Sequence, residues 1–237
     1  MTKTIGILET GRLPEALLPR HGSYPAMFER LLAGHGFAFR SWPVLDGAFP
    51  PMVDACDGWL ITGSRHGAYE DHAWIPPLEV FIRDAVAAGI PMVGICFGHQ
   101  IMAQALGGKV EKFAGGWGLG ASSYEIDGLG AVTVNAVHQD QVTVLPPGAE
   151  NAGHSAFCAH AAIRFSPHAW SLQPHPEMDS VFLADLLAAR REVFPATDIS
   201  GAEARLDRPL DQSPIAALMA AILSGQKTPA ATGRALD

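Results

Sequence analysis

Short apolar segments alternate with helical patterns through residues 4–106, and this alternation restricts the possible fold more than any other feature of the chain. Apolar runs of about four to eight residues fit buried strands, whereas apolar residues that recur every three or four positions fit one face of a helix. The predicted strands and helices cover, in chain order, residues 4–8, 24–35, 37–44, 58–62, 76–88, 91–95 and 99–106. Strands that alternate with helices indicate βαβ units, whose right-handed crossovers place helices on both faces of a parallel sheet.

The middle third of the chain has a different pattern, in which glycine-rich turns separate short strands. These strands are predicted at residues 110–113, 122–126, 131–134 and 141–145, followed by a hairpin at 162–165 and 169–172. Tight turns between short strands favour antiparallel pairing. We therefore expect an α/β fold with a mixed, mostly parallel central sheet, helices on both faces and a small antiparallel extension.

The last part of the chain is predicted to be helical at residues 180–194 and 214–224. The tail after Gly225 is small and polar, and we expect it to be mobile. With no linker-like stretch in between, the simplest division is one domain over residues 1–237, with a core at about 4–194 and a C-terminal helical extension at about 195–237.

The composition excludes several classes of protein. The formal net charge is −8, whereas nucleic-acid binders normally carry a basic surface. No apolar run is long enough to span a membrane, and the N-terminus lacks the pattern of a signal peptide. The three cysteines are odd in number and form no CxxC pair, which argues against a disulfide framework or a thiolate zinc site. We expect a cytoplasmic protein that binds neither nucleic acid nor membrane.

The heptapeptide GICFGHQ, residues 94–100, lies between a predicted strand and a predicted helix. This is the pattern of a nucleophile elbow, with Cys96 in place of the usual serine. Glycines on both sides permit a sharp turn, which puts the sulfur at a helix N-terminus where a thiolate is favoured. The backbone N–H of Phe97 is then available to an oxyanion. These features predict that Cys96 is a catalytic nucleophile.

The segment QPHPE, residues 173–177, supplies a candidate base. The prolines favour an extended chain, in which side chains two positions apart share a face. His175 and Glu177 would then project together, and a carboxylate beside an imidazole fixes its tautomer and supports its protonated form. We predict that His175 is the general base and acid and that Glu177 orients it.

Together, GICFGHQ and QPHPE resemble the class I (triad) glutamine amidotransferase domain, over about residues 4–194. The resemblance implies a flavodoxin-like fold, a γ-glutamyl thioester on Cys96 and release of ammonia from glutamine. It implies that the turn at Gly63 and Ser64 shares the oxyanion with the Phe97 N–H. The positions that it assigns to glutamine binding are Gln100, Val137, His138, Gln139 and Asp140.

Two further segments, HGSYPAMFERLL and TGSRHGAYEDHAWI, resemble a stand-alone, GMP-synthase-like subgroup that includes γ-glutamyl peptidases acting on glutathione conjugates. Synthetase amidotransferases usually have Gly-Gly where this chain has Gly63-Ser64, and His-Gly-Asp where it has His138-Gln139-Asp140. Both differences add side chains near the substrate. The substrate is therefore either free glutamine or a glutathione-like γ-glutamyl compound.

The chain has no ATP-pyrophosphatase signature, no Walker A motif and no dinucleotide fingerprint, so we expect no cofactor. An ammonia-producing domain of this kind needs a separate synthetase or acceptor subunit, unless the protein is a free-standing hydrolase. An inactive scaffold that binds a metabolite or a partner is the non-enzymatic alternative.

Two other enzyme classes fit less well. A cysteine variant of an α/β-hydrolase would have the acid before the histidine, whereas here the histidine comes first. A zinc hydrolase is disfavoured because the ten histidines form neither HExxH nor a cysteine-histidine cluster, so we expect no metal site. His66 and His72 would rim the pocket or lie on the surface. Trp74 and Trp117 would wall it or pack in the core.

Overall fold

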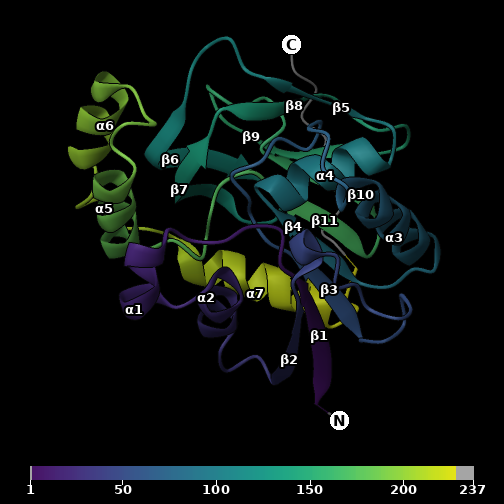
Figure 1. Cartoon of the computed structure of the whole chain (residues 1–237). Helices are drawn as coiled ribbons and strands as arrows, with labels where there is room; N and C mark the ends of the chain where they lie inside the picture. The colour runs from purple at the N-terminus through teal and green to yellow at the C-terminus, as the bar shows by residue number, and fades with distance from the viewer. Residues whose placement is uncertain (1, 228–237) are drawn as a thin grey trace.

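A nine-stranded sheet forms the centre of the molecule in the computed structural model, which describes residues 2–227 (Figure 1). The order of its strands is β2-β1-β3-β4-β11-β10-β9-β6-β7. The strands are β1 (Lys3–Leu8), β2 (Phe37–Trp42), β3 (Gly58–Ile61), β4 (Met92–Ile95), β6 (Gly118–Ile126), β7 (Gly130–His138), β9 (Glu150–His154), β10 (Ala162–Ser166) and β11 (Ala169–Leu172). A separate two-stranded sheet pairs β5 (Lys109–Lys112) with β8 (Asp140–Val144).

The α-helices surround this sheet, and the described residues also contain two short 3-10 turns, Glu15–Leu17 and Val44–Asp46. The helices are α1 (Leu18–His21), α2 (Tyr24–Leu31), α3 (Ile75–Ala87), α4 (Phe97–Ala105), α5 (Ser180–Ala189), α6 (Ala196–Glu203) and α7 (Gln212–Leu223). No helix among the described residues is long and apolar enough to cross a membrane.

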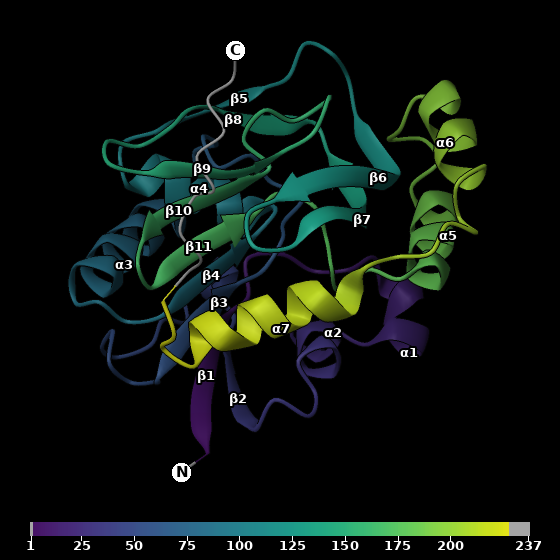
Figure 2. The same cartoon turned by 180° about the vertical axis from the view of Figure 1, so that it is seen from behind.

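Adjacent residues in the central strands point to opposite faces of the sheet and enter two different cores. Leu60 and Val93 pack in the core that contains α2 and α7, whereas their neighbours Ile61 and Met92 pack in the core that contains α3 and α4. Figure 2 shows α7 lying across the face opposite α3 and α4. The strands read as continuous apolar runs because both of their faces are covered.

One half of the sheet is parallel, as the βαβ pattern predicts. Parallel pairs join β2 to β1, β1 to β3, β3 to β4 and β4 to β11. The register aligns the ends of three strands, since Ile61 pairs with Gly94 and Ile95 pairs with Leu172. The loops that leave β3, β4 and β11 therefore start side by side, at the edge where open α/β sheets bind their ligands.

The other half of the sheet is antiparallel and runs through β10, β9, β6 and β7. The antiparallel extension is therefore present, but the small β5–β8 sheet is separate from it. No local sequence pattern predicts β9. Its sequence, ENAGH, has no apolar alternation and becomes a strand by pairing with β10 and β6.

The helix predicted at residues 180–194 is shorter in the structure, because α5 ends at Ala189. Arg190 departs from helical geometry, and Phe194 packs edge-on against Trp117 with ring centroids 4.9 Å apart. This aromatic contact requires the chain to leave the helix. Helix α6 is not predicted from the sequence either, and its Ile199 and Ala202 enter the same small core as Phe194. The division of the chain into one domain stays a prediction. The tail predicted to be mobile begins after Gly225, and its residues 228–237 lie outside those that the structure describes.

Candidate active site

Cys96 forms the entire connection between β4, which ends at Ile95, and α4, which begins at Phe97. Its φ of 53° is the one positive φ of a non-glycine residue among those that the structure describes. A residue with a Cβ is held in such a conformation only by its surroundings, and strain of this kind is concentrated at functional sites. The sharp turn predicted for GICFGHQ is thus confirmed.

The two glycines of this turn are needed for the packing of α4 on the sheet. A Cβ on Gly94 would lie 2.5 Å from the carbonyl oxygen of Gly98, and a Cβ on Gly98 would lie 2.4 Å from that of Ile61. Both contacts involve backbone atoms, which could move away only at a large cost in free energy. The close approach brings the N-terminus of α4 directly over the ends of β3 and β4.

His175 and Glu177 are hydrogen-bonded to each other, with 2.6 Å between His175 Nδ1 and Glu177 Oε1. Both side chains are buried, with exposed fractions of 3% and 0%. The His175 N–H donates to the Asn135 carbonyl oxygen at 2.8 Å, which ties the segment to β7. The two side chains meet as predicted, but through a bridge at His175 and a turn at residues 176–177 instead of a continuous extended strand.

The environment of His175 favours its protonated form. Burial by itself would lower the pKa of His175, but the negative charges of Glu177 and Cys96, with their hydrogen bonds, outweigh burial and raise this pKa well above its ordinary value. Since Nδ1 faces Glu177, Nε2 is the nitrogen that remains for Cys96. The second carboxylate oxygen of Glu177 has no hydrogen-bond partner among the described residues, and Glu177 also borders a separate cavity of about 390 Å³.

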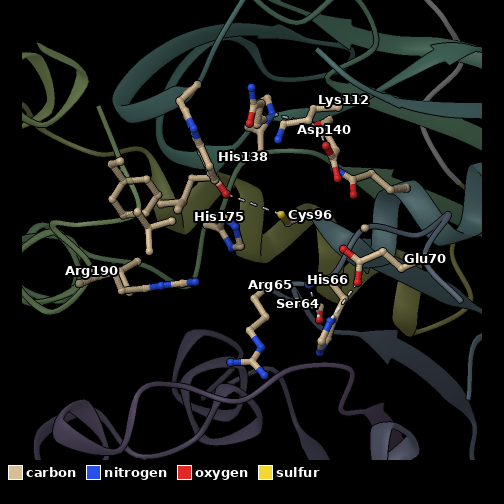
Figure 3. Close-up of a pocket in the computed structure, with 18 of the residues that line it drawn as sticks. Ser64, Arg65, His66, Glu70, Cys96, Lys112, His138, Asp140, His175 and Arg190 are labelled. Carbon is tan, nitrogen blue, oxygen red and sulfur yellow. Dashed lines mark hydrogen bonds and ion pairs between the residues drawn. The ribbon is translucent and has the colours of Figure 1, made fainter. Parts of the chain in front are cut away.

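Cys96 and His175 open into one cavity of about 280 Å³ (Figure 3). The Cys96 Sγ lies 3.9 Å from the Val137 carbonyl oxygen. The walls come from the loop after β3, from the connection between β7 and β8, and from the end of α5. The lining includes these residues predicted from the sequence: Ser64, Gln100, Val137, His138, Gln139 and Asp140.

The predicted oxyanion donors lie beside Cys96. A Cβ on Gly63 would be 2.9 Å from His175 Cε1 and 3.7 Å from Cys96 Cβ, so the Gly63 backbone passes close to both groups. Phe97 is the first residue of α4, where backbone N–H groups have no acceptor within the helix. Its ring is buried and packs against Trp74 at 5.4 Å. Only the backbone of Phe97 is therefore available to a substrate.

One wall of the cavity, called here the far wall, is formed by Gln100, His138 and Asp140, and its polar groups are held in fixed orientations. The Gln100 side-chain N–H groups donate to the Asp140 carbonyl oxygen at 2.9 Å and to Gln173 Oε1 at 3.1 Å. Burial lowers the pKa of His138 to about 4, so this ring is neutral near pH 7, and its Nε2 has no partner within residues 2–227. Burial raises the pKa of Asp140, whose carboxylate accepts a hydrogen bond from the Tyr69 hydroxyl at 3.1 Å.

The cavity also contains charged and aromatic residues that the sequence analysis misses as site residues. Neither Arg65 nor Arg190 forms an ion pair within residues 2–227, and Lys112 lies beside Asp140 (Figure 3). Tyr24 enters from the start of α2, and burial raises the pKa of its hydroxyl. No local pattern marks these residues, because they come from four separate segments of the chain.

Of the aromatic and histidine side chains expected near the pocket, Trp117 and His66 line the cavity. Trp74 is buried in the core against Phe97.

We expect Gly63→Ala to lower kcat/KM for any reaction that depends on Cys96 and His175 by about 10- to 100-fold. The added methyl group displaces the His175 ring, and small misplacements of reacting groups cause large losses of rate. Thermal unfolding should show that the variant stays folded. Gly201→Ala is a matched control in α6, where the nearest heavy atom to a new Cβ is Arg205 Nη1 at 3.5 Å. Full activity in Gly63→Ala would contradict the close packing of this turn against His175.

Comparison with known proteins identifies the relatives of this chain. The family model described as glutamine amidotransferase class-I matches residues 55–182. Gamma-glutamyl peptidase 4 of Arabidopsis thaliana is 30% identical over 182 residues, which is 70% of this chain and 72% of that protein. A GMP synthase (glutamine-hydrolyzing) of Bordetella parapertussis is 28% identical over 88% of this chain, which spans only 39% of that protein.

Among solved structures, a glutamine amido transferase from Methylobacillus flagellatus superimposes with a TM-score of 0.72. The match covers 99% of this chain and 100% of that one at 20% identity, so it is evidence of a common fold. The α/β architecture expected from the sequence is thereby confirmed.

Proposed function

Because this chain belongs to the class-I glutamine amidotransferase family, we propose that it hydrolyses a γ-glutamyl amide bond, as in glutamine, with Cys96 as the nucleophile. The observation that carries the proposal is the buried His175–Glu177 pair, 2.6 Å apart, whose imidazole shares one cavity with a strained cysteine at a helix N-terminus. Nucleophile, base and orienting carboxylate are the three parts that acyl transfer needs.

In the reactive form the proton of Cys96 resides on His175, and the Cys96 thiolate attacks the amide carbon. The backbone N–H of Phe97 and the turn at Gly63 and Ser64 stabilise the negative oxygen that forms. The His175 imidazolium then protonates the leaving nitrogen, ammonia departs and a γ-glutamyl thioester remains. Water, deprotonated by His175, attacks the thioester, releases glutamate and restores the thiol. Glu177 stabilises the imidazolium in both halves of the reaction.

Recognition of the amino-acid end of the substrate is assigned to the far wall of the cavity. The Asp140 carboxylate is suited to an α-ammonium group, and Lys112 is suited to an α-carboxylate. Gln100 keeps its carbonyl oxygen as an acceptor because both of its N–H groups are used internally. If free glutamine is the substrate, a separate synthetase subunit would accept the ammonia.

A second candidate substrate is a γ-glutamyl peptide, and the shape of the pocket favours it. The cavity adjoins a groove of about 460 Å³ that runs along the segment before α1, and the two share Arg65, His66, Arg190 and Val193. Ammonia as a leaving group uses none of this space. A peptide leaving group would extend into the groove, where the two arginines, which lack ion pairs within residues 2–227, suit a carboxylate.

A substrate comparison tests both candidates by measuring glutamate and ammonia released from glutamine, glutathione and glutathione amidated at its terminal carboxylate. If the peptide is the substrate, Arg190→Gln should raise KM for glutathione by about 10-fold or more, since a hydrogen bond to a charged group contributes about 1.5–3 kcal/mol. The same variant should leave KM for the amidated peptide and for glutamine nearly unchanged.

Arg191→Gln is the matched control, because Arg191 pairs with Glu203 and lies outside the cavity. Equal effects of Arg190→Gln on all three substrates would contradict a carboxylate-binding role. Failure of the wild-type protein to release glutamate from any of them, with the Cys96 thiol intact, would contradict the proposed hydrolysis itself.

A further inference from the structure

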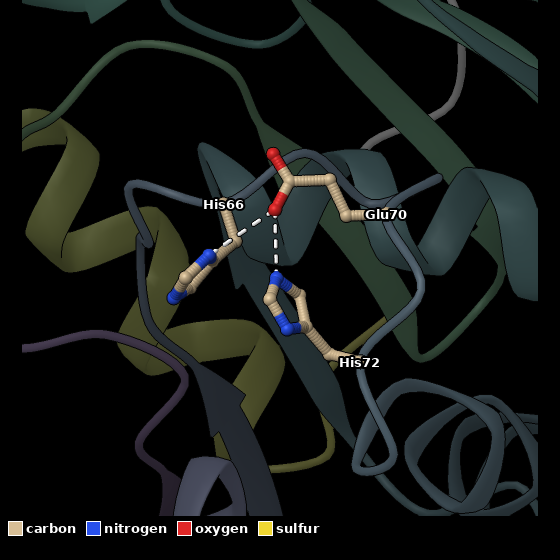
Figure 4. Close-up of side chains that lie close together, drawn as sticks. All are labelled: His66, Glu70 and His72. Atoms are coloured by element: carbon tan, nitrogen blue, oxygen red, sulfur yellow. Dashed lines mark hydrogen bonds and ion pairs between the residues drawn. The ribbon is translucent and has the colours of Figure 1, made fainter.

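Three side chains converge in the loop between β3 and α3. Glu70 Oε2 lies 3.2 Å from His66 Nδ1 and 2.7 Å from His72 Nε2 (Figure 4). The three potential ligand atoms all lie within 4.8 Å of one another. Their spacing in the sequence matches no common metal-binding motif, so their proximity arises from the path of the loop.

The rings of this cluster are held by aromatic packing. His72 stacks on Trp74, with centroids 5.8 Å apart and an interplanar angle of 13°. His66 stands edge-on to His72 at 4.2 Å. Since Trp74 itself packs on Phe97 of α4, the two imidazoles are supported by the core and do not project freely into solvent.

The loop backbone is anchored on both sides of the cluster. Gln104 of α4 donates to the Ala68 carbonyl oxygen at 2.7 Å, and the Ala68 side chain is fully buried. The Ser64 hydroxyl oxygen accepts a hydrogen bond from the His66 N–H at 3.2 Å. A preorganised loop reduces the entropy cost of binding a ligand at this position.

We propose that His66, Glu70 and His72 bind a divalent transition-metal ion of the Zn²⁺ class. Two imidazole nitrogens and one carboxylate oxygen are a donor set typical of zinc, with an open position left for water or a ligand. Ligand atoms around a tetrahedral zinc lie about 3.3 Å apart, for bonds of about 2.0–2.1 Å. The two nitrogen–oxygen separations are 3.2 and 2.7 Å and the two nitrogens lie within 4.8 Å of each other, so rotation of these side chains would bring the three donors to that spacing.

The charges and exposure of the cluster agree with binding of a cation. Glu70 contributes an acidic side chain to the cluster, and its Oε2 lies within hydrogen-bond distance of both imidazoles. The side chains are 23%, 42% and 33% exposed in the order His66, Glu70, His72, which lets an ion enter from solvent.

The position of the site gives it a consequence for the neighbouring cavity. His66 and Glu70 line the cavity that contains Cys96, and the loop that carries them also contains Gly63 and Ser64. A bound ion would add positive charge to the mouth of the cavity and fix the loop that precedes α3. This role is separate from the hydrolysis proposed above.

Metal binding should be measured in a Cys96→Ser background, so that the thiol cannot supply the binding. The chelator-treated protein is titrated with Zn²⁺ by calorimetry and with Co²⁺ by visible absorption. We expect one ion per chain and the d–d bands of nitrogen- and oxygen-bound Co²⁺. Adding His72→Ala should weaken Zn²⁺ binding by more than about 100-fold, because loss of even an outer partner of a ligand costs about 10- to 100-fold. His154→Ala, at an exposed histidine of β9, should bind like the parent.

Glu70→Gln provides a second variant, which keeps the shape of the side chain and should weaken binding in the same direction as His72→Ala. The absence of stoichiometric Zn²⁺ binding in the Cys96→Ser protein would overturn the proposal and leave the cluster as a pair of histidine–carboxylate contacts. Binding that survives both His72→Ala and Glu70→Gln would overturn it as well, because the ion would then be held elsewhere.

Discussion

Cys96→Ala is expected to lower kcat for glutamate release by at least about 10⁴-fold, since removing the nucleophile of a coupled catalytic unit removes nearly all of its rate enhancement. The side chain is 5% exposed and small, and alanine meets the same strain at a φ of 53°. The free energy of unfolding should therefore change little. Steady-state kinetics on the substrate with the highest rate and thermal unfolding of the same sample measure the two effects.

The matched control is Cys56→Ala, because Cys56 is also a buried free thiol but packs in the core on the α3 and α4 side of the sheet. It should keep wild-type activity. A glutamine-like electrophile should label the wild-type protein and the Cys56→Ala variant at Cys96 and leave Cys96→Ala unlabelled. Wild-type glutamate release by Cys96→Ala would rule out this nucleophile.

His175→Ala is expected to lower kcat/KM by at least about 10³-fold, since nucleophile and base act as a unit. Without the imidazole, the thiol has no proton acceptor and the leaving nitrogen has no proton donor. The substitution also leaves Glu177 without its partner at a site where its side chain is fully buried, so a loss of stability accompanies the loss of rate.

The double variant His175→Ala/Glu177→Gln separates the two effects. It removes the unpaired buried charge, so its free energy of unfolding should recover towards the wild-type value while its activity stays as low as that of His175→Ala. Recovery of activity together with stability would mean that the single variant fails by misfolding and that the base lies elsewhere.

Glu177→Gln alone should cost less activity than His175→Ala, because the base remains. Loss of the carboxylate charge removes a cause of the raised pKa of His175. This pKa should fall, and the alkaline limb of the pH profile of kcat/KM, where the imidazolium loses its proton, should move to lower pH. A limb that stays in place would contradict the electrostatic role of Glu177.

The sequence predicts the parallel half of the sheet well, because strands such as β3 and β4 are buried on both faces and read as uninterrupted apolar runs. It predicts β9 and α6 poorly. These segments have weak local preferences, and pairing with β6 and β10, or packing of Ile199 beside Phe194, decides their structure. The end of α5 is likewise set by a tertiary contact, that of Phe194 with Trp117.

Some residues of the candidate site are likewise evident from the sequence, whereas others reach the cavity only through the tertiary structure. Cys96 is evident from its flanking glycines, and the His175–Glu177 pair from their two-residue spacing between prolines. Arg190 reaches the cavity only because α5 ends one residue before it, and Lys112 only because β5 pairs with β8 beside Asp140. The convergence of His66, Glu70 and His72 depends on a loop whose path no local pattern encodes.

By itself, the sequence determined the chemistry carried by short segments: a cysteine at a tight strand-to-helix turn, and an imidazole with a carboxylate two residues later. Only the tertiary structure decided what surrounds that chemistry, namely the shared edge of β3, β4 and β11, the two arginines between cavity and groove, and the histidine–glutamate cluster at the mouth. The reason is physical. Turn geometry and backbone strain arise among adjacent residues, whereas a cavity wall is made of side chains that are far apart in the chain and meet only when the core packs.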